Sequence, residues 1–557
     1  MPANSLRPPR SRYKEFIHSE LFFFACQTLA KGPSEAVGSA DISPSASMDA
    51  LANPEVSSMA SPTHEEIENE GNGLASNVLG LFESSIMGIA GSAPAYSIAA
   101  TTVTLAITVG LFGPGELLYS GIAMFGVVLA FHYMGKVKQN AGATYVWVRN
   151  ALHPILGYLA GWSLVTASII FGLVSTLPAS TGLLSLFTNN QATISNTHWT
   201  TLVGALIFIF MVAIIAYGIE FTAKAQVVMT VVELGLLWIF DVVALFHHPH
   251  THHFSWSWFS FNQIKAYSND SAAAASSTPF ASHYVVAHGL SAILIGAVSG
   301  AFFYWGWDVT ANLNEETKNG KDDAGRGGIF GIFFVFFTFL LTIVALNMVL
   351  SDVTLHNSSS ILSDFAAVLI PGWFGKFIIV SVLLSTVATI ETQMIQVTRT
   401  LFSMGRDFTM PGAFGQVHKK FRTPWNATLF TTFFVLVFFV GSQFIKKVND
   451  IAQAGVAAIG IQICFYYALA AISVIVLYRH YLLKDIKTFL LVGLWPALSG
   501  LFLVAVLVKV IPTLSHLALW VGVGTVVIGV IPMAIFWRQG SSYFHKVTKE
   551  ERRALLD

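Results

Sequence analysis

Long apolar segments separated by short polar loops run through most of the chain. From about residue 80 onward, apolar runs of about 18 or more residues recur, and each could cross a hydrocarbon core of about 30 Å as an α-helix. The pattern predicts twelve membrane-spanning helices, at residues 80–109, 116–135, 155–183, 199–217, 224–246, 284–309, 329–351, 376–404, 427–444, 451–478, 488–510 and 515–537. The expected fold class is therefore an all-α membrane protein.

The composition agrees with this class. Hydrophobic residues make up 54% of the chain and charged residues 11%, against about 25% charged in typical soluble domains, which excludes a soluble protein. The net charge is zero by count, so the placement of the charges matters more than their sum. The apolar spans make the lipid bilayer the expected surrounding, and no nucleic-acid partner is expected.

Metal and cofactor motifs are not evident in the sequence. The two cysteines, Cys26 and Cys464, lie far apart and form neither a disulfide framework nor a metal motif. Five histidines between residues 247 and 253 match no defined metal-site spacing. We therefore expect no metal and no cofactor.

The distribution of basic residues predicts the orientation. Lysine and arginine cluster after the second, fourth, sixth, eighth and tenth predicted spans and in the C-terminal tail, whereas the intervening loops carry only scattered lysines. By the positive-inside rule, both termini are cytoplasmic. Twelve spans agree with this, because an even number places both termini on the same side.

The chain divides into four parts. Residues 1–75 are rich in Ser, Pro and Ala and are expected to form an unstructured cytoplasmic tail. Residues 76–478 hold the first ten predicted helices, 479–537 hold helices eleven and twelve, and 538–557 form a cytoplasmic C-terminal tail.

Two predicted spans carry residues that interrupt helices. The first contains "GIAGSAPAYS" (88–97) and the sixth contains "AFFYWGWD" (301–308). Each is the first span of a group of five, and interrupted segments in matching positions are typical of inverted-repeat transporters with a binding site at the membrane midplane. The alternative is that these small residues only permit close helix packing.

Four stretches resemble the amino acid–polyamine–organocation permease family. They are "GIAGSAPAYS", "NAGATYVWVRNALHPILGYLAGW" (140–162), "FFYWGWDVTANLNEETKNG" (302–320) and "TRTLFSMGRDFTMPGAFGQVHKKFRTP" (398–424). The first departs from the family's usual Gly-Ser-Gly pattern, because Pro94, Ala95 and Tyr96 stand there.

The resemblance covers residue 76 to the end and implies the fold of the bacterial leucine transporter. In that fold, ten helices form a 5+5 inverted repeat, here with two extra helices appended. The resemblance also implies alternating access, a substrate site between broken helices one and six, and coupling to protons, sodium or exchange.

The ends of the broken helices suggest how a zwitterion would bind. Free N–H groups near Pro94–Tyr96 suit a substrate carboxylate, and free carbonyls near Phe302–Trp305 suit an ammonium group. Gly306 lets the backbone turn, and Asp308 should begin the second half-helix. The candidate substrate-binding residues are Gly91, Ser92, Ala93, Pro94, Ala95, Tyr96, Phe302, Phe303, Tyr304, Trp305, Gly306 and Asp308.

Five aromatic residues crowd the second break: Phe302, Phe303, Tyr304, Trp305 and Trp307. One or two of them are expected to cover the substrate, where a cation–π contact would favour an amine. The others are expected to pack against neighbouring helices, and the resemblance favours Phe302 as the gate.

Two carboxylates inside predicted spans are candidates for ion or proton coupling. Glu233 and Glu391 lie within spans five and eight, where an ionised side chain is costly and usually functional. Many relatives carry a lysine at the position of Glu233. The alternative for each is a protonated glutamate that only packs.

Three hydroxyl residues of span eight, Ser385, Thr386 and Thr389, could supply oxygen ligands for sodium. They could equally bond back to helix carbonyls.

Arg399 is expected to extend toward the cytoplasmic surface or to pair with Asp407 or a helix end.

These features favour a secondary active transporter, or symporter, that takes up amino acids across the plasma membrane with protons or sodium. The alternative is a polyamine or organic cation transporter, or an amino-acid exchanger, of the same fold. A channel would need a filter sequence and an enzyme a catalytic constellation, and the sequence shows neither.

Overall fold

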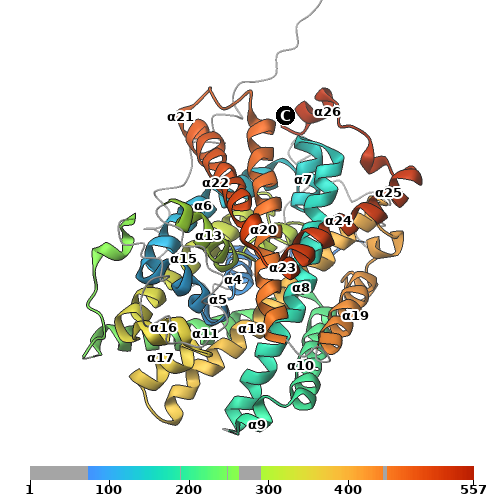
Figure 1. Cartoon of the computed structure of the whole chain (residues 1–557). Helices are drawn as coiled ribbons and strands as arrows, with labels where there is room; N and C mark the ends of the chain where they lie inside the picture. The colour runs from blue at the N-terminus through green and yellow to red at the C-terminus, as the bar shows by residue number, and fades with distance from the viewer. Residues whose placement is uncertain (1–72, 189, 248, 262–289, 443–447, 557) are drawn as a thin grey trace, which may run out of the picture. The chain divides into compact units, whose positions relative to one another are not determined.

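The computed structural model describes residues 73–188, 190–247, 249–261, 290–442 and 448–556 (Figure 1). Apart from an isolated bridge between Leu79 and Thr317, the regular structure of these residues is helical. The predicted tail 1–75 lies outside the described residues except for 73–75.

Ten helical segments in the described part of the chain are long and apolar enough to cross a membrane. They are Leu81–Val137, Pro154–Phe187, Thr197–Tyr217, Ile219–Phe246, Asp323–Val349, Trp373–Arg406, Trp425–Ser442, Ala454–Tyr478, Ile486–Thr513 and His516–Arg538, and Ile293–Phe303 is a shorter apolar helix. The protein is therefore a multi-pass membrane protein, as predicted.

The helices that build the membrane bundle can be followed by colour in Figure 1. They are α4 (Leu81–Ser92), α5 (Pro94–Val109), α6 (Gly113–Val137), α8 (Pro154–Phe187), α10 (Thr197–Tyr217), α11 (Ile219–Phe246), α13 (Leu290–Phe303), α14 (Val309–Asn312), α15 (Asp323–Val349), α18 (Phe377–Arg406), α19 (Trp425–Ser442), α20 (Val448–Tyr478), α22 (Trp495–Val510), α23 (His516–Leu519), α24 (Thr525–Ile528) and α25 (Val530–Arg538). Shorter helices connect or follow them: α7 (Thr144–Ala151), α9 (Gln191–Ile194), α16 (Asp352–Asn357), α17 (Ile361–Leu369), α21 (Ile486–Thr488) and α26 (Lys549–Ala554).

Both predicted interruptions are present. Helix α4 ends and α5 begins around Ala93, which has a left-handed backbone (φ 48°, ψ 64°). Pro94 is the first residue of α5, where its missing N–H costs no helical hydrogen bond. The second break separates α13 from α14, and Gly306 adopts a φ of 98° that glycine tolerates best.

Helices from both halves of the chain surround α4. It packs against α11, α14, α15 and α18 (Figure 1). Glycines line part of its contact with α15, where a Cβ added at Gly88 would lie 3.5 Å from the Cα of Gly331. This packing places the first break beside the helices that carry the candidate coupling residues.

Candidate functional site

The two helix breaks touch through their backbones. A Cβ added at Gly91 would lie 2.1 Å from the carbonyl oxygen of Gly306, and one added at Gly306 would lie 2.0 Å from the carbonyl oxygen of Gly91. Only hydrogen fits at either position, so the glycines allow two irregular backbone segments to meet inside the membrane.

The first turn of α5 is bound by two other helices. The N–H of Ala95 donates to Oε1 of Glu233 at 3.1 Å, and the N–H of Tyr96 donates to Oγ of Ser385 at 3.1 Å. The expectation that these N–H groups are free for a substrate is therefore wrong in this structure, because a buried carboxylate and a hydroxyl of the protein already accept from them.

The backbone of Glu233, whose side chain is buried, also binds α18. Its carbonyl oxygen accepts a hydrogen bond from Oγ of Ser381 at 2.8 Å. Its second carboxylate oxygen, Oε2, has no hydrogen-bond partner among the described residues. An oxygen of this kind, beside the break, is free to take a proton or a cation.

Glu391 has a different neighbour. Its Oε2 accepts from the amide of Gln226 on α11 at 2.7 Å, and the same amide donates to the carbonyl oxygen of Ala388. Glu391 is thus buried between α11 and α18 and bound to Gln226, seven residues before Glu233 on α11.

The three candidate sodium ligands make protein hydrogen bonds. Thr386 donates to the carbonyl oxygen of its own helix at Val382, and Thr389 donates to the carbonyl oxygens of Ala90 and Ser385. The bond to Ala90, 2.7 Å long, joins α18 to the last turn of α4. The contacts of Thr386 and Thr389 thus match the alternative in which hydroxyls bond to helix carbonyls, whereas the hydroxyl of Ser385 accepts from the N–H of Tyr96.

The aromatic residues of the second break separate into two groups. Phe302 and Trp305 join Tyr96 and Phe171 in what we term the aromatic cluster. Within it, the Phe171 ring meets Trp305 edge-on at 5.5 Å and Tyr96 edge-on at 5.6 Å. The cluster thus joins α5 and the second break through α8.

The remaining aromatic residues pack elsewhere. Phe303 and Tyr304 contact Phe339 of α15 at ring distances of 4.9 and 5.5 Å, and Trp307 contacts Phe131 of α6 at 5.0 Å. These three rings are buried among helices and do not face the aromatic cluster through any described ring contact.

Asp308 begins the second half-helix, as predicted, but its side chain does not cap it. Instead, its Oδ2 accepts from the hydroxyl of Tyr466 at 2.9 Å and its Oδ1 from that of Tyr467 at 3.0 Å. Both tyrosines lie on α20, so the carboxylate links the second break to the tenth predicted span.

Two ion pairs link the segment after α14 to the end of α18. Arg399 binds Glu316 through two hydrogen bonds of 3.0 Å, and both side chains are buried. Arg406 likewise binds Glu315 at 2.7 and 3.0 Å, closer to the surface. The expectation that Arg399 extends to the surface or pairs with Asp407 is wrong, because Glu316 satisfies its charge in the interior.

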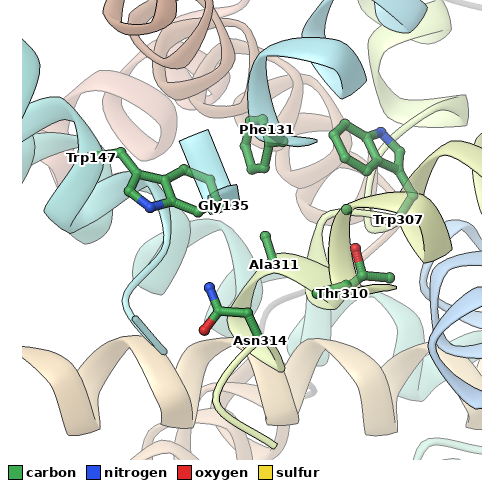
Figure 2. Close-up of a pocket in the computed structure, with 9 residues that line it drawn as sticks. Phe131, Gly135, Trp147, Trp307, Thr310, Ala311 and Asn314 are labelled. Carbon is green, nitrogen blue, oxygen red and sulfur yellow. The ribbon is translucent and has the colours of Figure 1, made fainter. Parts of the chain in front are cut away.

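A small cavity lies beside α14, and neither Gly91 nor Gly306 lines it. Figure 2 shows the rings of Phe131, Trp147 and Trp307 around it, with Thr310, Ala311 and Asn314 on the ribbon below. Its lining includes no residue of α4 or α5. Among the described residues, no group of three His, Cys, Asp or Glu side chains is placed to hold a metal ion.

The sequence pattern did not single out several buried residues of the membrane helices. Asp241 on α11 accepts from Thr342, and Glu116 on α6 accepts from Ser120. A search for carboxylates inside apolar runs would have found Asp241, whereas Glu116 opens its predicted span. Nothing in the sequence marks Phe171, which only the fold places beside the break.

Comparison with known proteins agrees with this architecture. A family model described as "Amino acid permease" matches residues 79–542. The branched-chain amino acid permease BcaP of Bacillus subtilis (strain 168) is 21% identical over 378 residues, which cover 63% of this chain and 72% of that protein. The methylthioribose transporter of the same organism is 21% identical over 375 residues, with the same coverage.

A third relative is the low-affinity putrescine importer PlaP of Escherichia coli (strain K12). It is 22% identical over 330 residues, which cover 56% of this chain and 63% of the importer. The three relatives are all transporters, yet their names give three different solutes.

Proposed function

The chain belongs to the amino acid permease family, and from this we propose that it is a secondary active transporter that takes up amino acids across the plasma membrane. Transport would proceed by alternating access, with both termini cytoplasmic. We propose twelve membrane helices: ten within 76–478 as a 5+5 inverted repeat and two within 479–537. Cytoplasmic tails would occupy 1–75 and 538–557.

The contact between Gly91 and Gly306 is the observation that carries this proposal. Irregular backbone at membrane depth persists only where protein or a cavity satisfies its polar groups. Two such segments in contact are suited to part around a solute and to rejoin, which is the movement that alternating access needs. The proposed site comprises residues 91–96 and 302–308, where the substrate would separate the two breaks.

We propose that Glu233 couples transport to protons. An ionised Glu233 accepts strongly from the N–H of Ala95, at the positive end of α5. A protonated Glu233 accepts more weakly, so α5 is held less tightly. Protonation of Glu233 therefore weakens the hydrogen bond that links α11 to α5. Sodium is the alternative coupling ion, because the hydroxyls of Thr386 and Thr389 donate to carbonyls but keep oxygen lone pairs for a cation.

The test uses purified protein in liposomes. Glu233→Gln keeps an oxygen for Ala95 but cannot take up a coupling proton. We expect it to retain exchange of labelled substrate while losing accumulation driven by a pH gradient. Glu220→Gln is the matched control, because Glu220 lies exposed on the same helix and pairs with Lys224. Unchanged pH dependence in the Glu233→Gln protein would rule out this coupling role.

An organic cation without a carboxylate is the second candidate substrate. The N–H groups of Ala95 and Tyr96, which would bind an α-carboxylate, are occupied by Glu233 and Ser385. A substrate that carries only an amine needs neither of them. The buried carboxylates of Glu233 and Glu391 would also suit a cation.

Matched pairs of compounds separate the two candidates. Leucine and isoamylamine, lysine and cadaverine, and ornithine and putrescine each differ only by a carboxyl group. Competition with labelled uptake should favour the amino acid of each pair if the first candidate holds. If the amines compete better throughout, the second candidate replaces it.

A further inference from the structure

A buried chain of hydrogen bonds runs from Trp305 to Asp308. The indole N–H of Trp305 donates to the hydroxyl oxygen of Tyr466 at 2.7 Å, and that hydroxyl donates to Oδ2 of Asp308 at 2.9 Å. All three side chains are buried, with exposed fractions of 3% or less. This series of hydrogen bonds starts and ends at residues of the second break and passes through Tyr466 of α20.

The direction of this chain is fixed by chemistry. An indole N–H can only donate, and an ionised carboxylate can only accept. The hydroxyl of Tyr466 must therefore accept a hydrogen bond from Trp305 and donate one to Asp308. A hydrogen bond to a carboxylate is stronger than one between neutral groups, so Asp308 orients the hydroxyl that Trp305 needs.

The bond to Tyr466 determines where the Trp305 ring lies. With its N–H held by α20, the ring meets the edge of Phe171 at 5.5 Å and lies 6.5 Å from Phe302. These separations are typical of favourable aromatic pairs. Trp305 is thus anchored on one side by a hydrogen bond and on the other by the aromatic cluster, next to the glycine contact at Gly306.

We propose that Asp308 is a positioning residue rather than a counter-ion for the substrate. It acts through Tyr466 to hold Trp305, which determines specificity for the apolar or cationic part of the solute. Each of its oxygens accepts a hydrogen bond from a tyrosine, so the carboxylate is already bound within the protein. The fixed indole face instead recognises an alkyl or ammonium group by packing and by cation–π attraction. This inference rests on the proposed transport function.

The neighbouring residue Tyr467 provides a matched control. Tyr467 is adjacent to Tyr466 on α20 and binds the same carboxylate at 3.0 Å, but Trp305 donates to Tyr466 and not to Tyr467. Tyr466→Phe removes the link to Trp305, whereas Tyr467→Phe leaves that link in place. Each variant loses one side-chain hydroxyl group.

The experiment measures KM and the maximal rate of uptake in liposomes, with thermal unfolding in parallel. Tyr466→Phe should raise KM about fivefold to tenfold, as expected when Trp305 loses the hydrogen bond that holds its ring, and leave the maximal rate within about twofold. Trp305→Phe should do the same, because it keeps a ring without the N–H. The double variant should be no worse than Tyr466→Phe alone, since the hydrogen bond between Trp305 and Tyr466 is already lost in that variant. Tyr467→Phe should stay within about twofold of the wild type.

Several outcomes would overturn the proposal. They are equal effects of Tyr466→Phe and Tyr467→Phe, additive losses in the double variant, or a fall in maximal rate and unfolding temperature without a change in KM. A loss in Asp308→Asn that is confined to charged substrates would also overturn it, because that result marks a counter-ion. If the wild-type protein carries no amine or amino acid at all, the proposed function itself fails, and the wild-type control shows this first.

Discussion

The buried pair of Arg399 and Glu316 should hold one side of the helix bundle closed, and Glu316→Gln tests this. The pair joins the segment after α14 to α18, two elements that must separate if a solute is to leave between them. Glutamine keeps the size and one acceptor oxygen of Glu316 but removes its charge. The guanidinium of Arg399 is then left buried without a counter-ion.

The magnitude follows from the burial of the pair. The two side chains are 1% and 0% exposed and share two hydrogen bonds of 3.0 Å. Removing one partner of such a pair costs about 3–5 kcal/mol, because the remaining charge stays desolvated and unpaired. Water would reach Arg399 in an open state and relieve this cost. The equilibrium should therefore move toward the open state by about 3 kcal/mol, roughly a hundredfold.

A cysteine accessibility assay can measure this shift. Ser403 is buried in this structure, where it donates to the side chain of Asn140 at 2.6 Å. We would place a single cysteine there, with Cys26 and Cys464 replaced by serine, and follow its reaction with a polar maleimide in membrane vesicles. In the Glu316→Gln background the labelling rate should rise by about a hundredfold.

The neighbouring pair provides the control. Glu315 and Arg406 join the same two elements but are 21% and 35% exposed, and pairs of this kind contribute at most about 1 kcal/mol. Glu315→Gln should therefore raise the labelling rate by less than about fivefold. Labelling that is no faster in Glu316→Gln than in Glu315→Gln would refute the reasoning.

Two further predictions concern the glycine contact and a pH-dependent ion pair. Gly306→Ala would place a Cβ 2.0 Å from the carbonyl oxygen of Gly91, at a φ of 98°, so uptake in liposomes should fall about a hundredfold; uptake near the wild-type rate would contradict the contact. Partial burial raises the pKa of Asp322, but its hydrogen bond and charge pair with Lys136 outweigh this and hold the pKa below its usual value. A carboxyl group with a lowered pKa stabilises the fold above its unfolded pKa of about 4 and loses that contribution as the pH falls further. Lys136→Met should therefore lower stability by less than about 1 kcal/mol at pH 7, and the gap should close as the pH falls from about 4 to below the lowered pKa of Asp322; thermal unfolding across this range measures the difference, and a constant gap at all pH values would contradict it.

The sequence was sufficient for those features that depend on local composition. Apolar runs of a given length identify membrane helices because the bilayer has a fixed thickness. Proline and glycine mark breaks because their backbone constraints act at the residue itself, and the structure interrupts the chain at Ala93 and around Gly306. The resemblance to a permease family also rested on contiguous stretches, and the family match over residues 79–542 confirms it.

The pairing of polar groups was decided by the tertiary structure alone. Arg399 lies 83 residues from Glu316, and Trp305 lies 161 residues from Tyr466. No periodicity along the chain encodes which buried donor meets which acceptor across helices. Such groups favour arrangements in which they find partners inside the membrane, because an unpaired polar group there is costly. The sequence could therefore show that partners were needed, whereas only the packing of the helices determined which residues became the partners.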